Sequence, residues 1–358
     1  MRTKILFCME DLCFGGTQRQ SLGLCLRLDR SRYDITVLTL TGPTDLDSCL
    51  EQANIPLVHL GQSRRVPPFF FLSLFFYLRK NPPDLVIPCT ALPNIWCRIH
   101  CALLGIPLLG TCRGGGGPKR QHERLLWHLT KHMICNSQAL FSVLHELGVP
   151  EEHLTYIPNG VDTDLFRPET PPPSERSPIL LCVARLCADK DQLTLMRAFA
   201  LVQAKEPSAE LWLVGDGPDA DKLKEWAKKN AHLKIRFIPG TQDVSPYYAK
   251  ARIFVLPSVR EGQPNVLLEA MSSALPICAT NVGGVGALLE EGKFGLLIPP
   301  SDVHALAYAL QKLLAHPNLG DAMGIQAREH VMQKYSYAQM CAAHSALFER
   351  FAARRTDV

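Results

Sequence analysis

Short apolar runs alternate with segments of helical spacing from one end of this 358-residue chain to the other. The runs are made mostly of Ile, Leu, Val and Cys, and turn residues often follow them. Such alternation is typical of parallel sheets with helices on both faces, so it predicts an α/β fold. The predicted strands are residues 5–8, 35–40, 85–88, 107–110, 133–135, 179–183, 211–214, 235–238, 253–256 and 277–279.

Chain length and one Pro-rich segment predict two domains. A single hydrophobic core rarely grows beyond about 250–300 residues. Residues 168–178 contain five prolines and cannot lie inside a helix or strand. We therefore expect two doubly wound domains facing a cleft, with a stiff linker and a C-terminal helix that packs back toward the first domain. The predicted boundaries are 1–168 and 179–335 for the domains, 169–178 for the linker and 336–358 for the helix.

Two carboxylates eight positions apart lie around the start of a predicted helix. Pro264 suits the first helical position, because its missing N–H has no partner there anyway. Glu261 falls on the preceding loop, at the carboxyl end of a strand, where α/β sheets bind their ligands. Glu269 falls about one turn into the helix, and the backbone amides between the two acids can bind phosphate. This layout fits a nucleotide-sugar; the alternative is an ordinary loop and helix with two surface acids.

Basic and glycine residues follow the neighbouring strands of the second half. Arg185 ends one strand, and Lys190 is predicted at the start of the next helix, where a cation opposes the helix dipole. Gly215 and Gly217 follow the next strand, and all these positions should share one rim of the sheet. The pattern suggests that Lys190 meets an anion, with a solvated surface lysine as the alternative.

A glycine pair also precedes the first predicted helix of the chain. Gly15 and Gly16 would let a backbone approach a ligand closely at a helix start. The segment is no G-x-G-x-x-G fingerprint, so it does not indicate dinucleotide binding, and a plain tight turn is the alternative.

Together these residues resemble family 4 of the retaining glycosyltransferases, which have the GT-B fold. The resemblance spans nearly the whole chain and implies two Rossmann-like domains, the first on the acceptor side and the second binding a nucleotide-sugar. It also implies a hexosyltransferase that retains the anomeric configuration. The matching pieces are Gly15-Gly16, residues 157–162, Arg185 with Lys190, residues 215–217, Pro257-Ser258, the Glu261–Glu269 pair, Gly283-Gly284 and residues 295–299.

The family pattern implies a role for each matching residue. Arg185 and Lys190 would bind the donor diphosphate, and Glu261 would hydrogen-bond the donor sugar as the third catalytic residue. Glu269 would hold the ribose hydroxyls. Fixed cations would offset the charge that grows on the leaving group. The remaining donor-binding positions are Gly15, Gly16, Gly215, Gly217, Gly262, Pro264, Asn265 and Val266.

Two positions depart from the family pattern. Members often carry a histidine after the fifth strand of the first domain, whereas this chain has Arg113 followed by four glycines. Arg113 cannot act as a general base; it could hold an anionic acceptor or phosphate, or simply position its loop. Members also often carry an acid where this chain has Ala287, and Glu290 and Glu291 lie nearby on another helical face.

No metal site is expected. Two acidic pairs have a D-x-D form, at residues 162–164 and 219–221, but we interpret the first as part of the interdomain run and the second as a helix cap. Arg185 and Lys190 would take the place of a metal ion. The UDP- or GDP-linked sugar is a substrate, so no cofactor is expected either.

Composition limits the setting and the partners. The net charge of +4 is too small to suggest nucleic acid. The 13 cysteines form no C-x-x-C pair and lie mostly in apolar runs, as free thiols do in a reducing compartment. The sequence shows neither a secretory signal nor an apolar run of about 20 residues, so we expect a cytoplasmic protein.

Residues 60–135 form a basic segment with an aromatic run inside it. The segment carries ten basic and two acidic residues, and residues 66–78 include five phenylalanines. A cationic face beside aromatics suits peripheral docking on the inner, anionic face of the cytoplasmic membrane. The alternative is a helix that buries its Phe face while the charges are solvated, and the nearly all-round apolar character slightly favours burial.

The sequence therefore predicts a glycosyltransferase that moves a sugar from a nucleoside-diphosphate sugar to a glycan or lipid-linked acceptor. The setting implied by the resemblance is assembly of bacterial-type cell-surface polysaccharide, lipopolysaccharide or glycolipid. Two alternatives on the same fold stay open: a nucleotide-sugar isomerase or hydrolase, and a non-catalytic nucleotide-sugar binder, which the departures at Arg113 and Ala287 allow.

Overall fold

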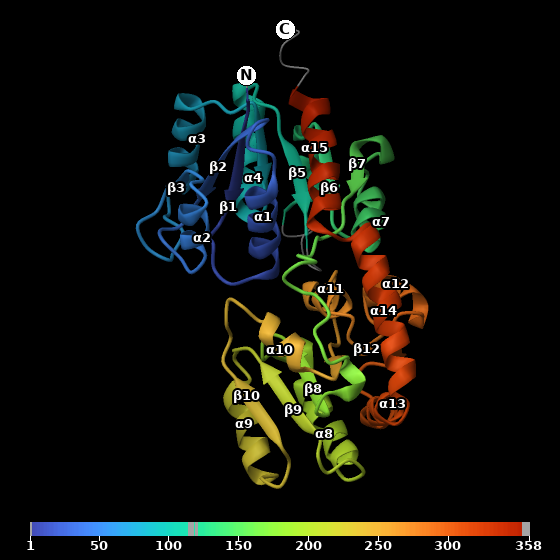
Figure 1. The fold of residues 1–358 in the computed structure, drawn as a ribbon. Coiled ribbons are helices and arrows are strands. Elements are labelled where there is room, and N and C mark those ends of the chain that lie inside the picture. The colour runs from blue at the N-terminus through green and yellow to red at the C-terminus, as the bar shows by residue number, and fades with distance from the viewer. Residues whose placement is uncertain (1, 114–117, 119–120, 353–358) are drawn as a thin grey trace. The chain divides into compact units, whose positions relative to one another are not determined.

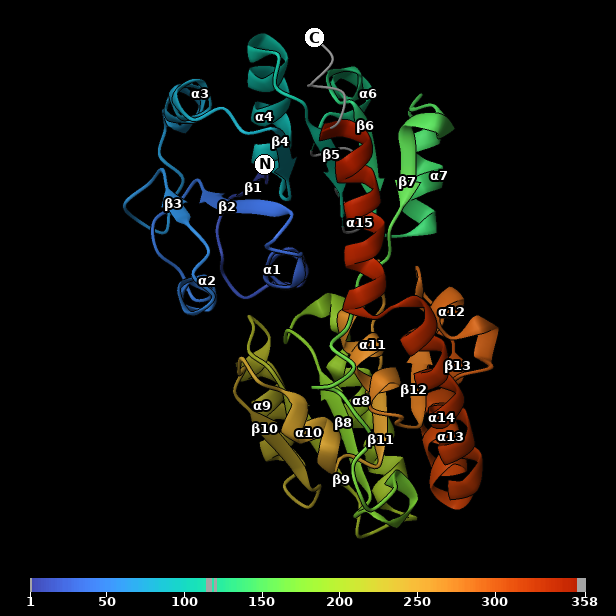
Figure 2. The same ribbon diagram turned by 45° about the horizontal axis from the view of Figure 1, so that its top comes forward.

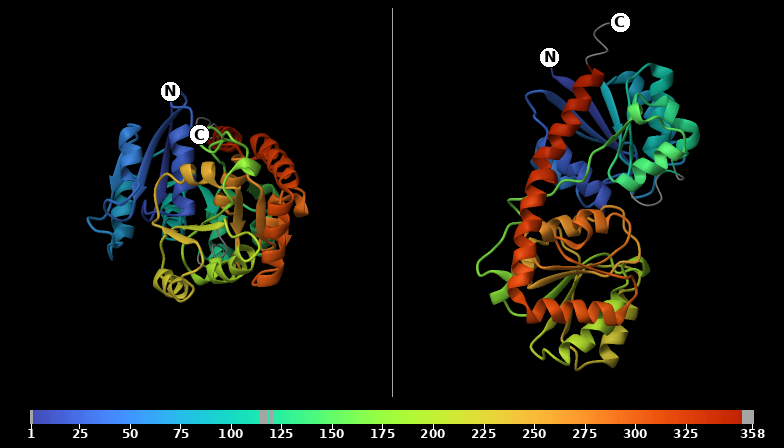
Figure 3. Two further views of the ribbon diagram at one scale, coloured as in Figure 1. Left: turned by 60° about the horizontal axis from the view of Figure 1, so that its bottom comes forward. Right: turned by 90° about the vertical axis from the view of Figure 1, so that its right-hand side faces the viewer.

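The computed structural model describes residues 2–113, 118 and 121–352. The chain divides into two compact units, which are called unit 1 (Met1–Gly160 with Tyr337–Val358) and unit 2 (Val161–Ser336). In each unit, helices pack around parallel strands (Figures 1 and 3). The α/β fold predicted from the alternating pattern is therefore confirmed.

Unit 1 is built on two sets of parallel strands. One sheet has the order β3-β2-β1-β4 and the other β5-β6-β7, and a bridge between Val86 and Leu108 joins β4 to the segment before β5. Residues 5–9 of β1 are all buried, because helices cover both faces of the sheet. The strands are β1 (Thr3–Met9), β2 (Tyr33–Thr39), β3 (Leu57–His59), β4 (Leu85–Pro88), β5 (Leu109–Cys112), β6 (His132–Cys135) and β7 (Leu154–Tyr156).

The helices of unit 1 form two layers around the β1 sheet. One core contains side chains of α1 (Gly16–Arg27), α2 (Asp47–Gln52) and α15 (Tyr337–Ala352), and the core on the opposite face contains side chains of α3 (Phe70–Lys80) and α4 (Ala91–Leu104). Figure 2 shows α1 and α15 apart from α3 and α4. The other helical elements among the described residues of unit 1 are α6 (Glu123–Leu126), α7 (Gln138–Glu146), η1 (Trp127–Leu129) and η2 (Glu151–His153).

Unit 2 has one six-stranded parallel sheet in the order β10-β9-β8-β11-β12-β13. The chain runs outward from β8 to β10 on one side and continues from β11 on the other, so the strand order reverses between β8 and β11. Such a switch point is where open α/β sheets bind ligands, outside the carboxyl ends of the strands. The strands are β8 (Ile179–Val183), β9 (Glu210–Val214), β10 (Ile235–Ile238), β11 (Ile253–Leu256), β12 (Ile277–Thr280) and β13 (Leu296–Ile298).

Two helix layers cover the unit 2 sheet. The core on one face contains side chains of α8 (Gln192–Gln203), α9 (Ala220–Lys229) and α13 (Val303–Ala315). The other face is covered by α10 (Ser245–Lys250), α11 (Asn265–Ser272), α12 (Val285–Leu288) and α14 (Pro317–Lys334). The short 3-10 turns are η3 (Pro173–Glu175), η4 (Ala188–Lys190) and η5 (Glu290–Gly292).

The boundary between the units differs from the predicted one. The chain leaves unit 1 after Gly160 rather than after residue 168, and the Pro-rich residues 169–178 lie inside unit 2. Arg176 holds this segment: its Nε donates to the carbonyl of Pro171 at 2.8 Å and its Nη1 to that of Ala251 at 3.0 Å. Composition shows that such a segment forms no regular element, but not whether it packs against a core. At the second boundary, α15 begins at Tyr337 and belongs to unit 1.

The described residues include no helix that is both long and apolar enough to cross a bilayer.

The sequence patterns missed β3, β7 and β13. Each of these strands has only three residues, too few to show a period.

Candidate functional site

An ion pair joins the two loops that lie at the switch point of unit 2. Lys190 follows β8 and Glu261 follows β11, and Lys190 Nζ lies 2.5 Å from Glu261 Oε1. The Ser258 hydroxyl donates to the same carboxylate oxygen at 2.7 Å. The Glu261 side chain is only 7% exposed and that of Lys190 24%. Because both partners are largely shielded from water, this charge-assisted bond is stronger than an exposed one.

Lys190 is not at the start of α8, where the sequence analysis placed it. It ends the 3-10 turn η4, and Asp191 caps α8 by accepting the N–H of Thr194. Lys190 therefore lies two positions before α8 begins, and the anion that it meets within the protein is Glu261. An ammonium group has three donors, so this contact does not use up its capacity for a ligand oxygen.

Glycines allow the loops along this rim to pack backbone against backbone. Gly215 has φ of +143°, and a β-carbon there would collide with the carbonyl of Ala184; one at Gly217 would collide with that of Leu186. At the other side of the switch point, the N–H of Gly284 donates to the carbonyl of Gly262 at 3.0 Å. The predicted glycines thus hold the loops after β8, β9, β11 and β12 together.

A second set of contacts ties the β11 loop to its neighbours. The N–H of Val259 donates to the carbonyl of Asp189 at 2.9 Å, and Arg260 Nη2 lies 2.7 Å from Asp189 Oδ2. On the β12 side, the Thr280 hydroxyl donates to the carbonyl of Ser258 at 2.5 Å. The loop that carries Glu261 is therefore fixed from both sides.

Helix α11 begins at Asn265, one residue later than predicted. Pro264 is its N-cap, with φ of −74° and ψ of 116°, so the proline precedes the first turn instead of forming its first position. Its extended ψ explains the shift, because a residue with that backbone angle is not helical. The first turn of α11, at Asn265 and Val266, still lies between Glu261 and Glu269 along the chain.

Glu269 lies inside α11 and is only 8% exposed. The hydroxyl of Tyr248, on α10, donates to Glu269 Oε2 at 2.8 Å. The Tyr248 ring is buried, stacked on Phe254 with ring centroids 5.6 Å apart and edge-on to Phe166 at 5.3 Å. Sequence reasoning missed Tyr248, because the 21 positions between it and Glu269 give no local signal.

Arg185 is exposed at the end of β8, at the predicted position on the rim. Its carbonyl accepts a hydrogen bond from Gln192 Nε2 at 3.0 Å, which ties the β8 loop to the start of α8. The structure thus brings Lys190 and Glu261 into contact and places Arg185, Gly215 and Gly217 on the loops beside them.

The predicted residues of unit 1 lie after β1 and β5. Gly16 is the first residue of α1 and Gly15 is its N-cap. Further along α1, Gln20 exchanges two hydrogen bonds with the backbone of Gly160, at 2.8 and 2.9 Å. The glycine pair therefore opens a helix that also holds the last residue before the chain leaves unit 1.

Arg113 is partly buried and bound within the protein. Its Nη1 donates to Asn159 Oδ1 at 3.1 Å, and Asn136 Nδ2 donates to the same oxygen at 3.2 Å. Burial lowers the pKa of the Arg113 guanidinium, but arginine keeps its charge in proteins. The contacts support the loop-positioning alternative for Arg113. Gly114–Gly117, Lys119 and Arg120 lie outside the described residues.

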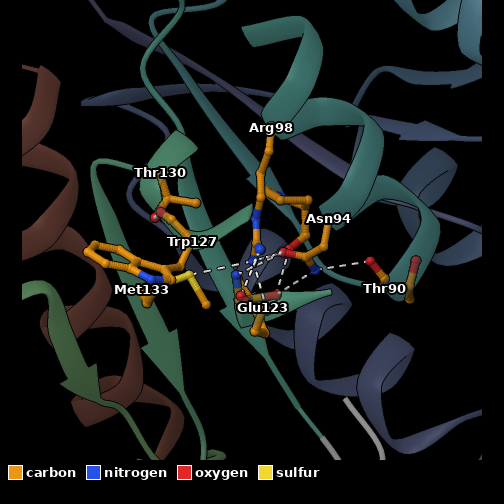
Figure 4. Close-up of polar contacts among 9 residues, drawn as sticks. Thr90, Asn94, Arg98, Glu123, Trp127, Thr130 and Met133 are labelled. Carbon is orange, nitrogen blue, oxygen red and sulfur yellow. Dashed lines mark hydrogen bonds and ion pairs between the residues drawn. The ribbon is translucent and has the colours of Figure 1, made fainter. Parts of the chain in front are cut away.

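A buried ion pair lies behind the β5 end in unit 1. Arg98 on α4 makes a two-pronged contact with Glu123, Nη1 to Oε2 at 2.7 Å and Nη2 to Oε1 at 2.9 Å, and neither side chain is exposed. Asn94 accepts from Arg98 and from the N–H of Thr111, at 3.2 and 3.1 Å. Figure 4 shows these side chains converging. Burial raises the pKa of Glu123, and Arg98 opposes that shift.

The D-x-D segments lie in a turn and at a helix start. Asp162 Oδ1 accepts the N–H groups of Asp164 and Leu165, so it shapes its own turn. Asp219 lies at the N-cap of α9, without a side-chain capping bond. In the described ranges, no group of three or more His, Cys, Asp or Glu side chains is arranged to hold a metal ion.

The two acids near Ala287 are engaged elsewhere. Glu290 lies 3.1 Å from Lys293 Nζ and 3.3 Å from His330 Nδ1. Glu291 has a positive φ of 52°, and its carboxylate lies over Gly286, where a β-carbon would stand 3.2 and 3.3 Å from the two oxygens.

Comparison with known proteins identifies the family. Residues 14–165 match the model of Glycosyltransferase Family 4, and residues 177–316 match that of Glycosyl transferases group 1. An uncharacterized glycosyltransferase of Haemophilus influenzae is 34% identical over 87% of this chain and 90% of its own length. The UDP-Gal:alpha-D-GlcNAc-diphosphoundecaprenol alpha-1,3-galactosyltransferase of Escherichia coli is 28% identical over 83% of this chain and 84% of its own.

Other relatives match over a shorter stretch or in fold alone. The GDP-mannose-dependent alpha-(1-6)-phosphatidylinositol monomannoside mannosyltransferase of Mycobacterium tuberculosis is 29% identical over 54% of this chain, and the match covers 55% of that protein. Anabaena HepE, solved with UDP and glucose, superimposes with a TM-score of 0.83 over 97% of this chain and all of its own, at 20% identity. From these matches and the two parallel α/β units, we conclude that the chain belongs to glycosyltransferase family 4, of the glycosyl transferases group 1 type, and has the GT-B fold of that family.

Proposed function

We propose that the protein is a retaining glycosyltransferase that moves a hexose from a UDP- or GDP-linked donor to a glycan or lipid-linked acceptor. We place it in the cytoplasm, in the assembly of bacterial-type cell-surface polysaccharide, lipopolysaccharide or glycolipid. The observation that carries the proposal is the Lys190–Glu261 pair at the switch point of the unit 2 sheet, one loop away from the start of α11.

The rim of unit 2 suits each part of such a donor. Glu261 is a shielded carboxylate held by Lys190 and Ser258, so it can accept hydrogen bonds from sugar hydroxyls in a fixed geometry. The first amides of α11 lie between Glu261 and Glu269 and can receive the diphosphate. Glu269, which is held by Tyr248, would then accept hydrogen bonds from the ribose hydroxyls.

Leaving-group stabilisation is assigned to the cations of the same rim. When the bond between the anomeric carbon and the diphosphate oxygen breaks, negative charge grows on the phosphate. Arg185, Lys190 and the helix amides are charges and dipoles already in place for it. Lys190 would donate hydrogen bonds to two groups, the Glu261 carboxylate and a phosphate oxygen.

The donor and acceptor classes rest on the relatives. The E. coli relative is named for UDP-Gal and a diphosphoundecaprenol acceptor, the mycobacterial one for GDP-mannose and a phosphatidylinositol monomannoside, and HepE was solved with UDP-glucose. A relative in Rhizobium meliloti is named for lipopolysaccharide core biosynthesis. These names support a nucleoside-diphosphate sugar as donor and a glycan or lipid-linked sugar as acceptor.

Acceptor-dependent release of nucleoside diphosphate is the experiment that tests the proposal. UDP- and GDP-sugars would be screened first by thermal shift, since a ligand at 100 times its dissociation constant adds about 2.7 kcal/mol of stability. The stabilising donor is then incubated with lipid-linked and free glycan acceptors, and we expect release only when an acceptor is present. Conversion of the donor without acceptor would indicate an isomerase or hydrolase instead. Tight binding of the donor without turnover would indicate a non-catalytic binding protein. NMR of the product should show a retained anomeric configuration.

Arg185→Ala should weaken donor binding by about tenfold to a hundredfold, because a charge-assisted hydrogen bond to phosphate contributes about 1.5–3 kcal/mol. Calorimetric titration with the nucleoside diphosphate measures the change. Arg236→Ala is the matched control: Arg236 lies over the Trp212 ring on the same sheet and is not assigned to the donor. Equal affinities for Arg185→Ala and the wild-type protein would remove Arg185 from the phosphate site.

Transfer should survive removal of divalent cations. Under the proposal, Arg185 and Lys190 offset the diphosphate charge that a metal ion would otherwise offset, so no bound metal is required. Initial rates would be measured with excess EDTA and again after adding magnesium or manganese. Rates within about twofold of one another are expected under the proposal. A complete loss that either metal restores would refute it.

A further inference from the structure

The phenylalanine run of unit 1 has two faces with different surroundings. Along α3, Phe70, Leu74 and Leu78 are buried in the core shared with α4. On the other side of the helix and its N-cap, Phe69 is 69% exposed, Leu72 48% and Phe76 60%. The predicted burial therefore holds for one side of this element, and the other side is exposed.

The exposed apolar residues share one helical face. Phe69, Leu72 and Phe76 are spaced by three and four positions, so they lie above one another along the helix. We call these three residues, with Arg79 and Lys80 at the next turn, the α3 face. Figures 1 and 2 show α3 at the margin of unit 1. Clustered exposed aromatics of this kind mark an interaction site more often than scattered single residues do.

The charge near the α3 face is mainly positive. Residues 52–83 contain four basic residues and no acidic one. Arg64 is paired with Asp45 at 2.8 Å, whereas Arg65, Arg79 and Lys80 are exposed, and no described carboxylate lies within 4 Å of their charged groups. An apolar face bordered mainly by cations complements a surface that is apolar inside and anionic at its edge.

We propose that the α3 face docks the protein on a bilayer that contains anionic phospholipid. Phe69, Leu72 and Phe76 would enter the boundary between headgroups and acyl chains, while Arg65, Arg79 and Lys80 would contact lipid phosphates. Phe70, Leu74 and Leu78 anchor the helix to the unit 1 core, so the face is held rigidly and need not fold on binding. The inference rests on this surface alone and goes beyond the proposed transfer reaction.

Co-sedimentation of the full chain with vesicles tests the proposal. We expect binding to vesicles of phosphatidylglycerol and phosphatidylcholine at 0.05 M salt and little binding to phosphatidylcholine alone. Binding should weaken as salt rises, because screening shortens the reach of the cations to about 3 Å at 1 M. Phe69→Ser with Phe76→Ser should lower the partition coefficient by about tenfold or more. Arg79→Glu with Lys80→Glu should lower it at least as much at low salt.

Matched controls come from unit 2. Tyr308 and Ile325 are 71% and 56% exposed, so Tyr308→Ser with Ile325→Ser removes a similar amount of exposed apolar surface. Lys222→Glu with Lys224→Glu reverses two exposed charges on α9. Both controls should bind vesicles within about twofold of the wild-type protein. All four variants should fold and bind the donor nucleotide as the wild-type protein does. Only Arg79→Glu with Lys80→Glu should lower the thermal midpoint slightly, because it puts two acids at the negative end of the α3 dipole.

Three results would overturn the proposal. Vesicle binding that is the same with and without Phe69 and Phe76 would show that this face does not meet the bilayer. Equal losses of vesicle binding in the α3 variants and in the unit 2 controls would show that the protein adsorbs to vesicles without a defined face. A concentration-dependent dimer in sedimentation velocity that Phe69→Ser with Phe76→Ser abolishes would assign the face to a second copy of the chain. Because donor binding is measured separately, none of these outcomes bears on the transfer reaction.

Discussion

Glu123→Gln is expected to lower the free energy of unfolding by about 3–5 kcal/mol, the usual cost of removing one partner of a buried ion pair. The Arg98 guanidinium would stay in a fully buried site with its charge uncompensated. Urea unfolding followed by fluorescence measures the change, and Trp127 lies close to the pair in Figure 4. A loss of less than about 1 kcal/mol would contradict the assignment.

Two further variants separate the charge from the packing. Glu152→Gln makes the same chemical change at an exposed position of unit 1 and should alter stability by less than about 0.5 kcal/mol. Arg98→Met with Glu123→Leu removes both charges, and it should recover most of the loss, because apolar side chains of similar volume often replace a buried ion pair without cost. A double variant no more stable than Glu123→Gln would show that the packing of the Arg98 and Glu123 side chains, and not only their charges, stabilises the site.

Glu261→Gln is expected to lower kcat by about 10²–10³-fold, as removal of one preorganised group at a reacting centre commonly does. Glutamine keeps the size of the side chain but removes the charge that holds Lys190 at 2.5 Å and receives the Ser258 hydroxyl. Initial transfer rates at saturating donor measure the effect. Glu225→Gln, at a carboxylate 67% exposed on α9, is the matched control and should keep its kcat within about twofold.

Lys190→Ala extends this prediction, since it leaves the shielded Glu261 carboxylate without its cation. Its kcat should fall by a factor similar to that of Glu261→Gln, and the two changes combined should cost little more than either alone. Additive losses would mean that the two side chains act independently and that the ion pair between Lys190 and Glu261 does not contribute to transfer.

The order of strand, loop and helix along the rim could be predicted from the sequence, because it depends on local patterns. The β11 run, the loop with Glu261 and the helix with Glu269 follow one another along the chain, and only the helix start moved, from Pro264 to Asn265. Glycines before a helix or after a strand are equally local. Gly215 and Gly217 lie where the pattern placed them, and their close approach to neighbouring carbonyls gives the reason for glycine there.

Contacts between distant segments could not be predicted in this way. The Lys190–Glu261 pair spans 71 positions and exists because β8 lies beside β11, which a strand list alone does not reveal. Tyr248 meets Glu269 through the packing of α10 on α11. The buried pair of Arg98 and Glu123 could not be predicted either, because in the sequence they are simply two charged residues of a basic segment.

The Phe run shows a different limit. With apolar residues nearly all round the helix, no period separates a buried from an exposed side, so the sequence supported both burial and exposure. Contact with α4 decides which residues belong to the core. For example, Phe71 stacks on Trp96 of α4, with ring centroids 5.0 Å apart. Likewise, composition identified residues 169–178 as irregular, but Arg176 keeps them in unit 2.

Calorimetric titration of UDP and GDP into the wild-type protein, Glu269→Gln and Glu261→Gln tests whether the unit 2 rim binds the donor. Glu269 is assigned to the ribose, and Glu261 to the sugar that the bare nucleotide lacks. We therefore expect that the wild-type protein binds one of the two nucleotides, that Glu269→Gln weakens this binding by about tenfold or more, and that Glu261→Gln changes it by less than about threefold. The reverse order, or a wild-type protein that binds neither nucleotide, would contradict the assignment of this rim to the donor.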